Sequence, residues 1–193
     1  LALVKHFDYI LKFANDIIFL FDKNYTIVEV NDKAIETYQY DRKELIGQNV
    51  SMLRSDAMVD RLHKDLHELN EIGYSTYETI HKRKDGTTFP IEISARRFDI
   101  EGAKYYQSIS RDITDRRRAE ETLRESEERF RKLFEDSPIG MVMTGKDMGI
   151  IKANSTFCKM LGYTEEELSG MTFRSFTHPD HISTDEISIL QLV

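Results

Sequence analysis

The sequence predicts an α+β fold arranged as two tandem modules, and three observations support this prediction. Residues 25–47 and 148–170 carry one repeated pattern, whose period is far too long for a solenoid and therefore indicates two separate domains. Apolar residues recur at helical spacing in several segments of the first module. In residues 74–113 the period changes to two, which is typical of strands.

The repeat is specific in its residue types and their spacing. At a constant offset, residues of the first copy fall on identical residues of the second: Asn31 on Asn154, Tyr40 on Tyr163, Glu44 on Glu167, Leu45 on Leu168 and Gly47 on Gly170. Far fewer residues follow the second copy than follow the first, so we expect the second module to be cut short. The chain also starts at Leu1 without a Met, and we expect an internal fragment of a longer protein.

Composition narrows the class of protein. The 193 residues have a formal net charge of −7, with basic residues interleaved among acidic ones, so we expect no binding of nucleic acid. The longest purely apolar run, Ile17–Phe21, is far shorter than the roughly 20 residues of a spanning helix, and we expect no membrane contact within this segment. The single cysteine, Cys158, cannot form an intramolecular disulfide, which fits a reducing cytoplasm.

The chain is predicted to open with an amphipathic helix over residues 1–14. Apolar residues recur there at alternating spacings of four and three: Leu3, Phe7, Ile10 and Ala14. Such a narrow apolar seam is typical of a helix that pairs with a partner helix. Two strands follow, at Ile17–Phe21 and residues 25–30, joined by a polar turn.

Short helices are predicted after the second strand. Asn31 should cap the first of them, because its side chain can accept hydrogen bonds from the free amides of the first turn. Asp41 should open another turn over residues 41–46, which Gly47 ends by tolerating a positive φ. A longer helix over residues 55–70 carries leucines at helical spacing.

The rest of the first module reads as three strands. Residues 74–82 and 87–97 should form a hairpin, because an Asp-Gly turn between alternating runs is the strongest short hairpin signal. A fifth strand follows at residues 104–113. Pro90 cannot donate a backbone hydrogen bond, so we expect a bulge or an unpaired amide at its position.

Residues 115–135 are dense in charge and predict a helical linker with a coiled-coil seam. Its seam positions keep a strict four-three repeat: Ala119, Leu123, Ser126, Phe130 and Leu133. The alternative is a solvated helix that lies against its own domain, because the seam is short and contains a serine. We expect a homodimer, with contacts drawn from both ends of the first module: Leu3, Phe7, Ile10, Leu123, Phe130 and Leu133.

The second module, residues 136–193, repeats only the N-terminal half of the pattern. Two strands and two helices are predicted in it, at residues 140–144, 148–153, 154–161 and 165–168. A two-stranded ribbon is marginal alone in water and would expose an apolar face. We therefore expect a second chain to complete this module, with residues 140–176 carrying much of the interface.

Motifs in both copies resemble the PAS sensory module. In the first copy they are V-N-D-K-A at residues 30–34, E-L-I-G at 44–47, K-R-K-D-G-T-T-F-P at 82–90 and S-R-D-I-T-D-R at 110–116. In the second copy they are F-E-D-S-P-I-G at 134–140, L-G-Y at 161–163, E-L-S-G at 167–170 and T-H-P-D at 177–180. The resemblance implies a first PAS domain at residues 15–114, with a five-stranded antiparallel sheet whose concave face and short helices enclose a small pocket.

The resemblance also implies site residues. In relatives the Asp and Thr of the D-I-T motif clamp the junction of the last strand and the output helix, so Asp112 and Thr114 are the expected signal-coupling residues. The residues alone suggest that they cap the linker helix, and the two interpretations are compatible. The candidate pocket residues are apolar or aromatic and could equally be plain core: Ile18, Leu20, Tyr38, Met52, Leu53, Ile93 and Tyr106.

The residues argue against haem and flavin and leave an unknown small metabolite, or no ligand, as the open alternatives. Relatives that form a flavin adduct carry a Cys in a G-x-N-C motif, where this chain has Val50. Haem-bearing relatives place a histidine ligand where this chain has Glu71, and a solvated helix edge explains His63 and His67. No convincing partner is evident for His81, and we expect no metal site.

The sequence contains no phosphate-binding loop, phosphoacceptor helix or cyclase signature, and no convergent set of acid, base and nucleophile. We therefore expect a non-enzymatic, cytoplasmic sensory and relay segment of a multidomain signalling protein, with its effector domain outside this sequence. By resemblance the parent is a sensor histidine kinase, with a diguanylate cyclase or phosphodiesterase second. The alternative is a protein-interaction or dimerisation scaffold without a small-molecule ligand.

Overall fold

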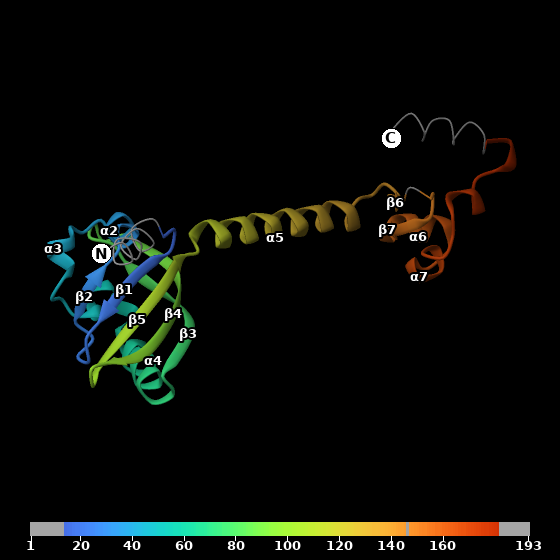
Figure 1. Cartoon of the computed structure of the whole chain (residues 1–193). Helices are drawn as coiled ribbons and strands as arrows, with labels where there is room; N and C mark the ends of the chain where they lie inside the picture. The colour runs from blue at the N-terminus through green and yellow to red at the C-terminus, as the bar shows by residue number, and fades with distance from the viewer. Residues whose placement is uncertain (1–13, 146, 182–193) are drawn as a thin grey trace. The chain divides into compact units, whose positions relative to one another are not determined.

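The computed structural model describes residues 14–145 and 147–181, drawn in colour in Figure 1. The chain divides into two compact units, Leu1–Ala119 and Glu120–Val193, which are described separately below. The predicted helix over residues 1–14, with its seam positions Leu3, Phe7 and Ile10, lies outside the described residues apart from its last position.

The first unit is built on a five-stranded antiparallel sheet with strand order β2-β1-β5-β4-β3, which confirms the predicted α+β class and sheet. The strands are β1 (Ile17–Phe21), β2 (Ile27–Val30), β3 (Tyr74–Lys82), β4 (Thr88–Ile100) and β5 (Ala103–Asp112). β4 runs further than predicted, because Glu101 and Gly102 both adopt positive φ, at 51° and 80°. This geometry makes a two-residue turn whose twist matches the flanking strands, so Ile100 pairs directly with Ala103.

No bulge occurs at Pro90, because the register of β4 with β3 is continuous through the pair of Pro90 with Ile80. The proline instead marks the end of the ladder with β5. Its carbonyl accepts a hydrogen bond from the Ile113 amide at 3.1 Å, but it has no N–H to return to the Ile113 carbonyl. That carbonyl accepts from the Arg117 amide at 2.9 Å, which is the first turn of the following helix.

Short helices connect the edge of the sheet to the hairpin. They are α2 (Asp32–Tyr38), α3 (Arg42–Leu45), the 3₁₀ turns η1 (Val50–Leu53) and η2 (Asp56–Met58), and α4 (Val59–Ile72). α4 begins later than predicted because the 3₁₀ turn η2 precedes it. α2 packs against β1, and α4 packs against β3 and β4, so the apolar core lies between this layer and one face of the sheet.

Asn31 and Asn154 explain why the repeat keeps an asparagine. The buried Asn31 carboxamide caps α2 by accepting from the Ala34 amide at 3.1 Å, and it also accepts from the Ile18 amide at 3.0 Å. Asn154, fully buried, repeats both bonds with the amides of Phe157 at 2.9 Å and Met141 at 2.8 Å. Each asparagine therefore satisfies free amides and ties a helix N-terminus to the start of its module, at Ile18 in β1 and at Met141 directly before β6.

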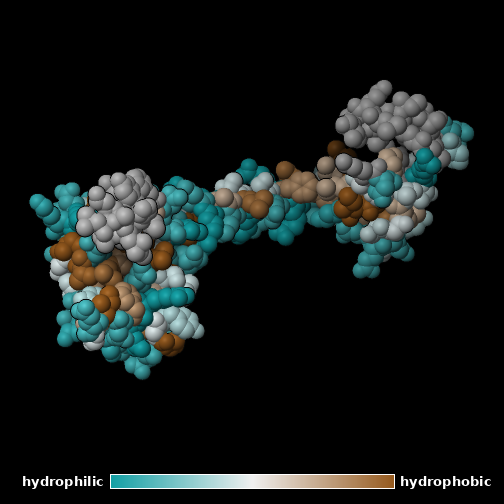
Figure 2. Space-filling view, in the orientation of Figure 1, coloured by the Kyte–Doolittle hydropathy of each residue, from teal (hydrophilic) through white to brown (hydrophobic). Residues whose placement is uncertain are grey.

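Helix α5 (Thr114–Glu135) follows β5 after a single residue and confirms that the linker is helical. Its seam side chains are exposed in the single chain, at 61% for Leu123, 49% for Phe130 and 69% for Leu133. Hydrophobic surface is visible along α5 in Figure 2. The coiled-coil seam, its alternative and the dimer contact all stay predictions.

The second unit contains a two-stranded sheet among its described residues. Its elements are β6 (Val142–Thr144), β7 (Ile150–Ala153), α6 (Ser155–Leu161), α7 (Glu165–Leu168), η3 (Phe173–Ser175) and η4 (Pro179–His181). The core is small, formed by Ile150, Ala153 and Leu168 with a few half-buried neighbours. Large apolar side chains remain exposed here, including Ile139 at 71% and Met160 at 70%. None of the helices among the described residues combines the length and the apolar character that crossing a bilayer requires.

Candidate functional site

A cavity of about 40 Å³ lies between the inner face of the sheet and the short helices of the first unit. Its walls are mostly apolar and aromatic and come from every strand of this sheet except β2, and from α2, η1 and α4. Among the candidate pocket residues, Tyr38, Leu53, Ile93 and Tyr106 line this cavity. The sequence therefore brings these four side chains to one place from four different elements.

The other three candidate residues do not line the cavity. Along β1, Ile17, Phe19 and Phe21 are buried, so Ile18 and Leu20 fall on the opposite face of the sheet, where they are half-buried. Met52 is half-buried on η1 and packs against the core without forming part of the cavity wall. The predictions for Ile18, Leu20 and Met52 as pocket residues are therefore corrected.

A buried polar cluster at the cavity was not predicted. Arg54, only 2% exposed, lines the cavity and donates from Nη1 to Thr79 Oγ1 at 2.6 Å and from Nη2 to the Tyr77 hydroxyl at 2.8 Å. Its Nη2 also lies 3.2 Å from Asp65 Oδ2, and Asp65 is 6% exposed. Asp65 therefore compensates the positive charge of Arg54 inside the protein, because a buried charge without a partner is energetically costly.

The sequence did hold a signal for this cluster. Asp65 lies three residues after Leu62 and four before Leu69, on the apolar face of α4. A carboxylate on an apolar helix face needs a buried partner, which in this fold comes from Arg54 at the end of η1.

His81 has a partner, contrary to the sequence-based expectation. It is 3% exposed, and its Nδ1 lies 2.5 Å from the Tyr38 hydroxyl. Burial, and then the nearby Arg54 charge, hold the pKa of His81 well below its usual range, so the imidazole is neutral. Burial also raises the pKa of Tyr38, so the phenol keeps its proton and can donate it to Nδ1.

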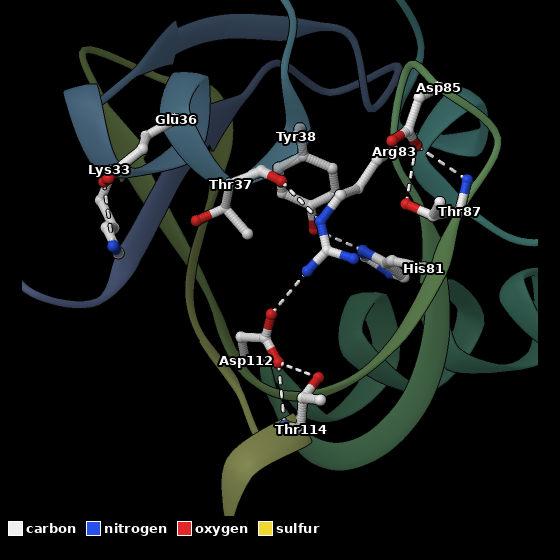
Figure 3. Close-up of polar contacts among 10 residues, drawn as sticks. All are labelled: Lys33, Glu36, Thr37, Tyr38, His81, Arg83, Asp85, Thr87, Asp112 and Thr114. Atoms are coloured by element: carbon white, nitrogen blue, oxygen red, sulfur yellow. Dashed lines mark hydrogen bonds and ion pairs between the residues drawn. The ribbon is translucent and has the colours of Figure 1, made fainter.

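A set of polar contacts joins this pair to the end of the sheet, as Figure 3 shows. Arg83, two residues after His81, donates from Nε to the Thr37 carbonyl at 2.9 Å, and the Lys84 amide donates to the Tyr38 carbonyl at 3.0 Å. The Arg83 guanidinium stacks over the Phe89 ring, 3.9 Å from its centroid, and its Nη2 lies 2.8 Å from Asp112 Oδ2. The end of α2, β3 and β5 are thus held together by one side chain.

Asp112 and Thr114 lie where β5 becomes α5. Asp112 Oδ1 accepts from the Thr114 amide at 2.9 Å and from Thr114 Oγ1 at 2.5 Å, while its Oδ2 pairs with Arg83. The carboxylate therefore satisfies an amide at the start of the helix and contacts the rest of the domain at once. The capping contact is thus made by the Asp112 side chain, and the signal-coupling role of Asp112 and Thr114 stays a prediction.

The first turn of α5 is also fixed to the outer sheet by charge. Glu78 on β3 pairs with Arg116 at 2.6 Å and with Arg117 at 2.5 Å, and Arg116 lies 3.6 Å from Glu92 on β4. Each of these pairs is at least one-third exposed and contributes little alone. Together they connect the first turn of α5 to β3 and β4.

The residues present do not fit haem or an adduct-forming flavin. His63 and His67 are exposed on the edge of α4 and are absent from the cavity wall. Val50 does line the cavity but offers no thiol. The cavity is also far smaller than the roughly 300–1,000 Å³ of sites for cofactor-sized ligands. Within residues 14–145 and 147–181, no group of three or more His, Cys, Asp or Glu side chains could hold a metal ion.

A family model described as PAS domain matches residues 15–115, and a second PAS domain model matches residues 128–192. The chain belongs to the PAS domain family. PAS domains are non-catalytic sensory modules, and both matched segments are of this kind.

Similar proteins with known names are sensor and signalling proteins. The chain is 28% identical over 161 residues to sporulation kinase E of Bacillus subtilis, which covers 83% of this chain and 22% of that kinase. It is 38% identical over 69 residues to the "Probable diguanylate cyclase DgcE" of Escherichia coli, covering 36% of this chain and 6% of that protein. The chain thus spans less than a quarter of the length of either relative.

Solved PAS structures share the fold of the first domain. The PAS domain of an HTR-like protein from Haloarcula marismortui superimposes with a TM-score of 0.53 at 25% identity, covering 58% of this chain and 93% of that one. A PAS domain from a two-component sensor histidine kinase gives a TM-score of 0.52 at 21% identity, covering 57% and 96%. The predicted PAS fold is confirmed.

Proposed function

We propose that this chain is the sensory and signal-relay segment of a multidomain signalling protein, in which the first PAS domain passes a change at its cavity to helix α5. One observation carries this proposal: the contacts that run from His81 and Tyr38 at the cavity, through Arg83, to Asp112 at the start of α5. A signal at the cavity thus has a short route to the helix that leaves the domain, made of hydrogen bonds and of the backbone that joins Thr37 to Tyr38 and His81 to Arg83.

The parent is a sensor histidine kinase in this proposal, and its effector domain lies outside the sequence. Sporulation kinase E supports this choice because it aligns over both PAS domains of this chain. An input region of a diguanylate cyclase is the second candidate, supported by the higher identity to DgcE over a shorter segment. We place the segment in the cytoplasm and expect it to act as a homodimer.

A scaffold without sensory function is the competing candidate, favoured by the exposed apolar side chains of α5 and of the second unit. The sensory and the scaffold function are distinguished by testing whether the cavity and α5 are energetically coupled. Tyr38→Phe removes the hydroxyl that meets His81 without changing the aromatic core. Asp112→Asn removes the ion pair with Arg83 but keeps a side-chain oxygen that can cap Thr114.

The measurement is hydrogen exchange of the Arg117 amide, which bonds the Ile113 carbonyl in the first turn of α5. If the relay exists, Tyr38→Phe speeds this exchange in the wild-type chain and has a smaller effect in the Asp112→Asn background. Asp99→Asn, an exposed carboxylate on β4, is the matched control and should leave the effect intact. If Tyr38→Phe changes the environment of His81 but leaves the exchange rate of the Arg117 amide unchanged, the result would favour the scaffold.

A further inference from the structure

Arg54 and His81 lie side by side at the polar end of the cavity. The two residues face each other in an isolated antiparallel bridge, supported by a hydrogen bond from the Ser55 amide to the Ile80 carbonyl at 3.2 Å. Directly paired residues of antiparallel segments project their side chains to the same face. Both side chains line the cavity and both are more than nine-tenths buried.

Each of the two side chains has one nitrogen without a hydrogen-bond partner among the described residues: Arg54 Nε and His81 Nε2. The guanidinium is always protonated, so Arg54 Nε is a donor. The imidazole is neutral. Among the described residues His81 Nδ1 is the hydrogen-bond partner of the buried Tyr38 hydroxyl, so we assign the hydroxyl as the donor and place the ring proton on Nε2. Buried donors without acceptors are rare in proteins, and two of them on neighbouring side chains of the cavity lining indicate that an acceptor belongs beside them.

We propose that Arg54 Nε and His81 Nε2 form a two-donor subsite that binds the oxygen of a small, uncharged carbonyl compound, such as an amide or a ketone. The apolar part of the ligand contacts the aromatic and aliphatic walls, which include Phe19 and Ile93. This subsite deepens the sensory function proposed above and rests on it, because His81 is also the partner of Tyr38 at the start of the relay.

Charge and size define the ligand class. The Arg54 charge is already compensated by Asp65 at 3.2 Å, so a carboxylate ligand would bring a second, unpaired negative charge into the buried site. A cavity of about 40 Å³ is small. At on the order of 10–15 Å³ per water-sized group, it accepts about three to four non-hydrogen atoms without rearrangement. Acetamide and acetone have this size, and acetate is a charged molecule of the same shape.

Binding can be tested with these three probes on the complete chain, by NMR titration of the cavity amides and of the His81 ring nitrogens. Acetamide and acetone should bind, acetate should bind more weakly than either, and the Nε2–H signal should shift on binding. Arg54→Lys keeps a cation beside Asp65 but removes the Nε donor, and His81→Leu removes the ring donor because leucine has no side-chain N–H. Each variant should weaken binding by about five- to tenfold, as expected for one lost hydrogen bond. His63→Gln, at an exposed position on α4, should leave it unchanged.

Several results would overturn the subsite: no binding of the neutral probes, tighter binding of acetate, or wild-type affinity in both donor variants. If the variants do not fold, the wild-type ring decides the matter, because a proton found on Nδ1 instead of Nε2 removes one of the two donors. The relay is judged separately by the Tyr38→Phe and Asp112→Asn exchange experiment, which needs no ligand. If the probes do not bind but the cavity and α5 are coupled in the exchange experiment, the subsite is rejected and the sensory function is kept.

Discussion

Replacing Asp65 by leucine should destabilise the first PAS domain by about 3–5 kcal/mol, the usual cost of removing one partner from a buried ion pair. Arg54 is 2% exposed and Asp65 is 6% exposed, so water cannot replace the lost carboxylate without opening the domain. Arg54 would keep its bonds to Thr79 and Tyr77, but both partners are neutral and neither compensates its charge.

The double variant Arg54→Met with Asp65→Leu separates this cause from a simple packing defect. With both charges gone, no unpaired charge remains, and the double change should cost clearly less than the sum of the two single changes. Glu68→Leu replaces an exposed carboxylate on the same helix and should stay within about 0.5 kcal/mol of wild type.

Native-state hydrogen exchange of amides in β4 and β5 is the suitable assay, because these strands report opening of the first domain alone in a chain with two units. A loss below about 1 kcal/mol in Asp65→Leu would refute the reasoning. So would strict additivity of the two single changes, since it would mean that the two charges do not interact in the folded domain.

Three further predictions concern pH, assembly and the second domain. The pKa of His81 is lowered in the fold from its usual 6.5, so below about pH 6.5 the unfolded state binds a proton that the folded state does not. Stability should therefore fall below this pH, by at most about 1.4 kcal/mol per pH unit. His81→Gln should flatten this dependence in thermal unfolding, and an unchanged slope would mean that the histidine is not buried as a neutral ring. Leu123→Glu should weaken a homodimer by about 1.5–3 kcal/mol in sedimentation equilibrium, whereas a wild-type chain that is monomeric at high micromolar concentration would exclude the seam as an interface. Amides of residues 140–176 should gain protection only when the chain associates, and full protection in a monomeric sample would show that the second domain is complete by itself.

Much of the first domain follows from local sequence signals. The cap at Asn31 and the hairpin between β3 and β4 depend on residues close together in the chain, and both are predicted correctly. The face of β1 was not predictable in the same way. Ile17–Phe21 is apolar at every position, so no alternation shows which residues point inward, and Ile18 and Leu20 were placed on the wrong side.

The polar end of the cavity was missed because it depends on contacts between distant segments. β3 buries Thr79 and His81 and leaves Ile80 half-exposed, which reverses the usual rule that the apolar side chains of a strand face the core. That reversal makes sense only once Arg54 and Asp65 are known to lie opposite this strand. A charged side chain on the apolar face of α4 was the one local indication of it.

Pro90 limits how far the sheet can grow. An alanine in its place would direct an N–H at the Ile113 carbonyl, and this one additional strand hydrogen bond would favour extended backbone at the residue directly before α5. The proline removes this alternative, so the boundary between β5 and α5 has a single position along the chain. In the proposed relay, a disturbance of the sheet would therefore not be absorbed by converting a turn of helix into strand, and we expect it to reach α5 as a change in the direction or rotation of the helix.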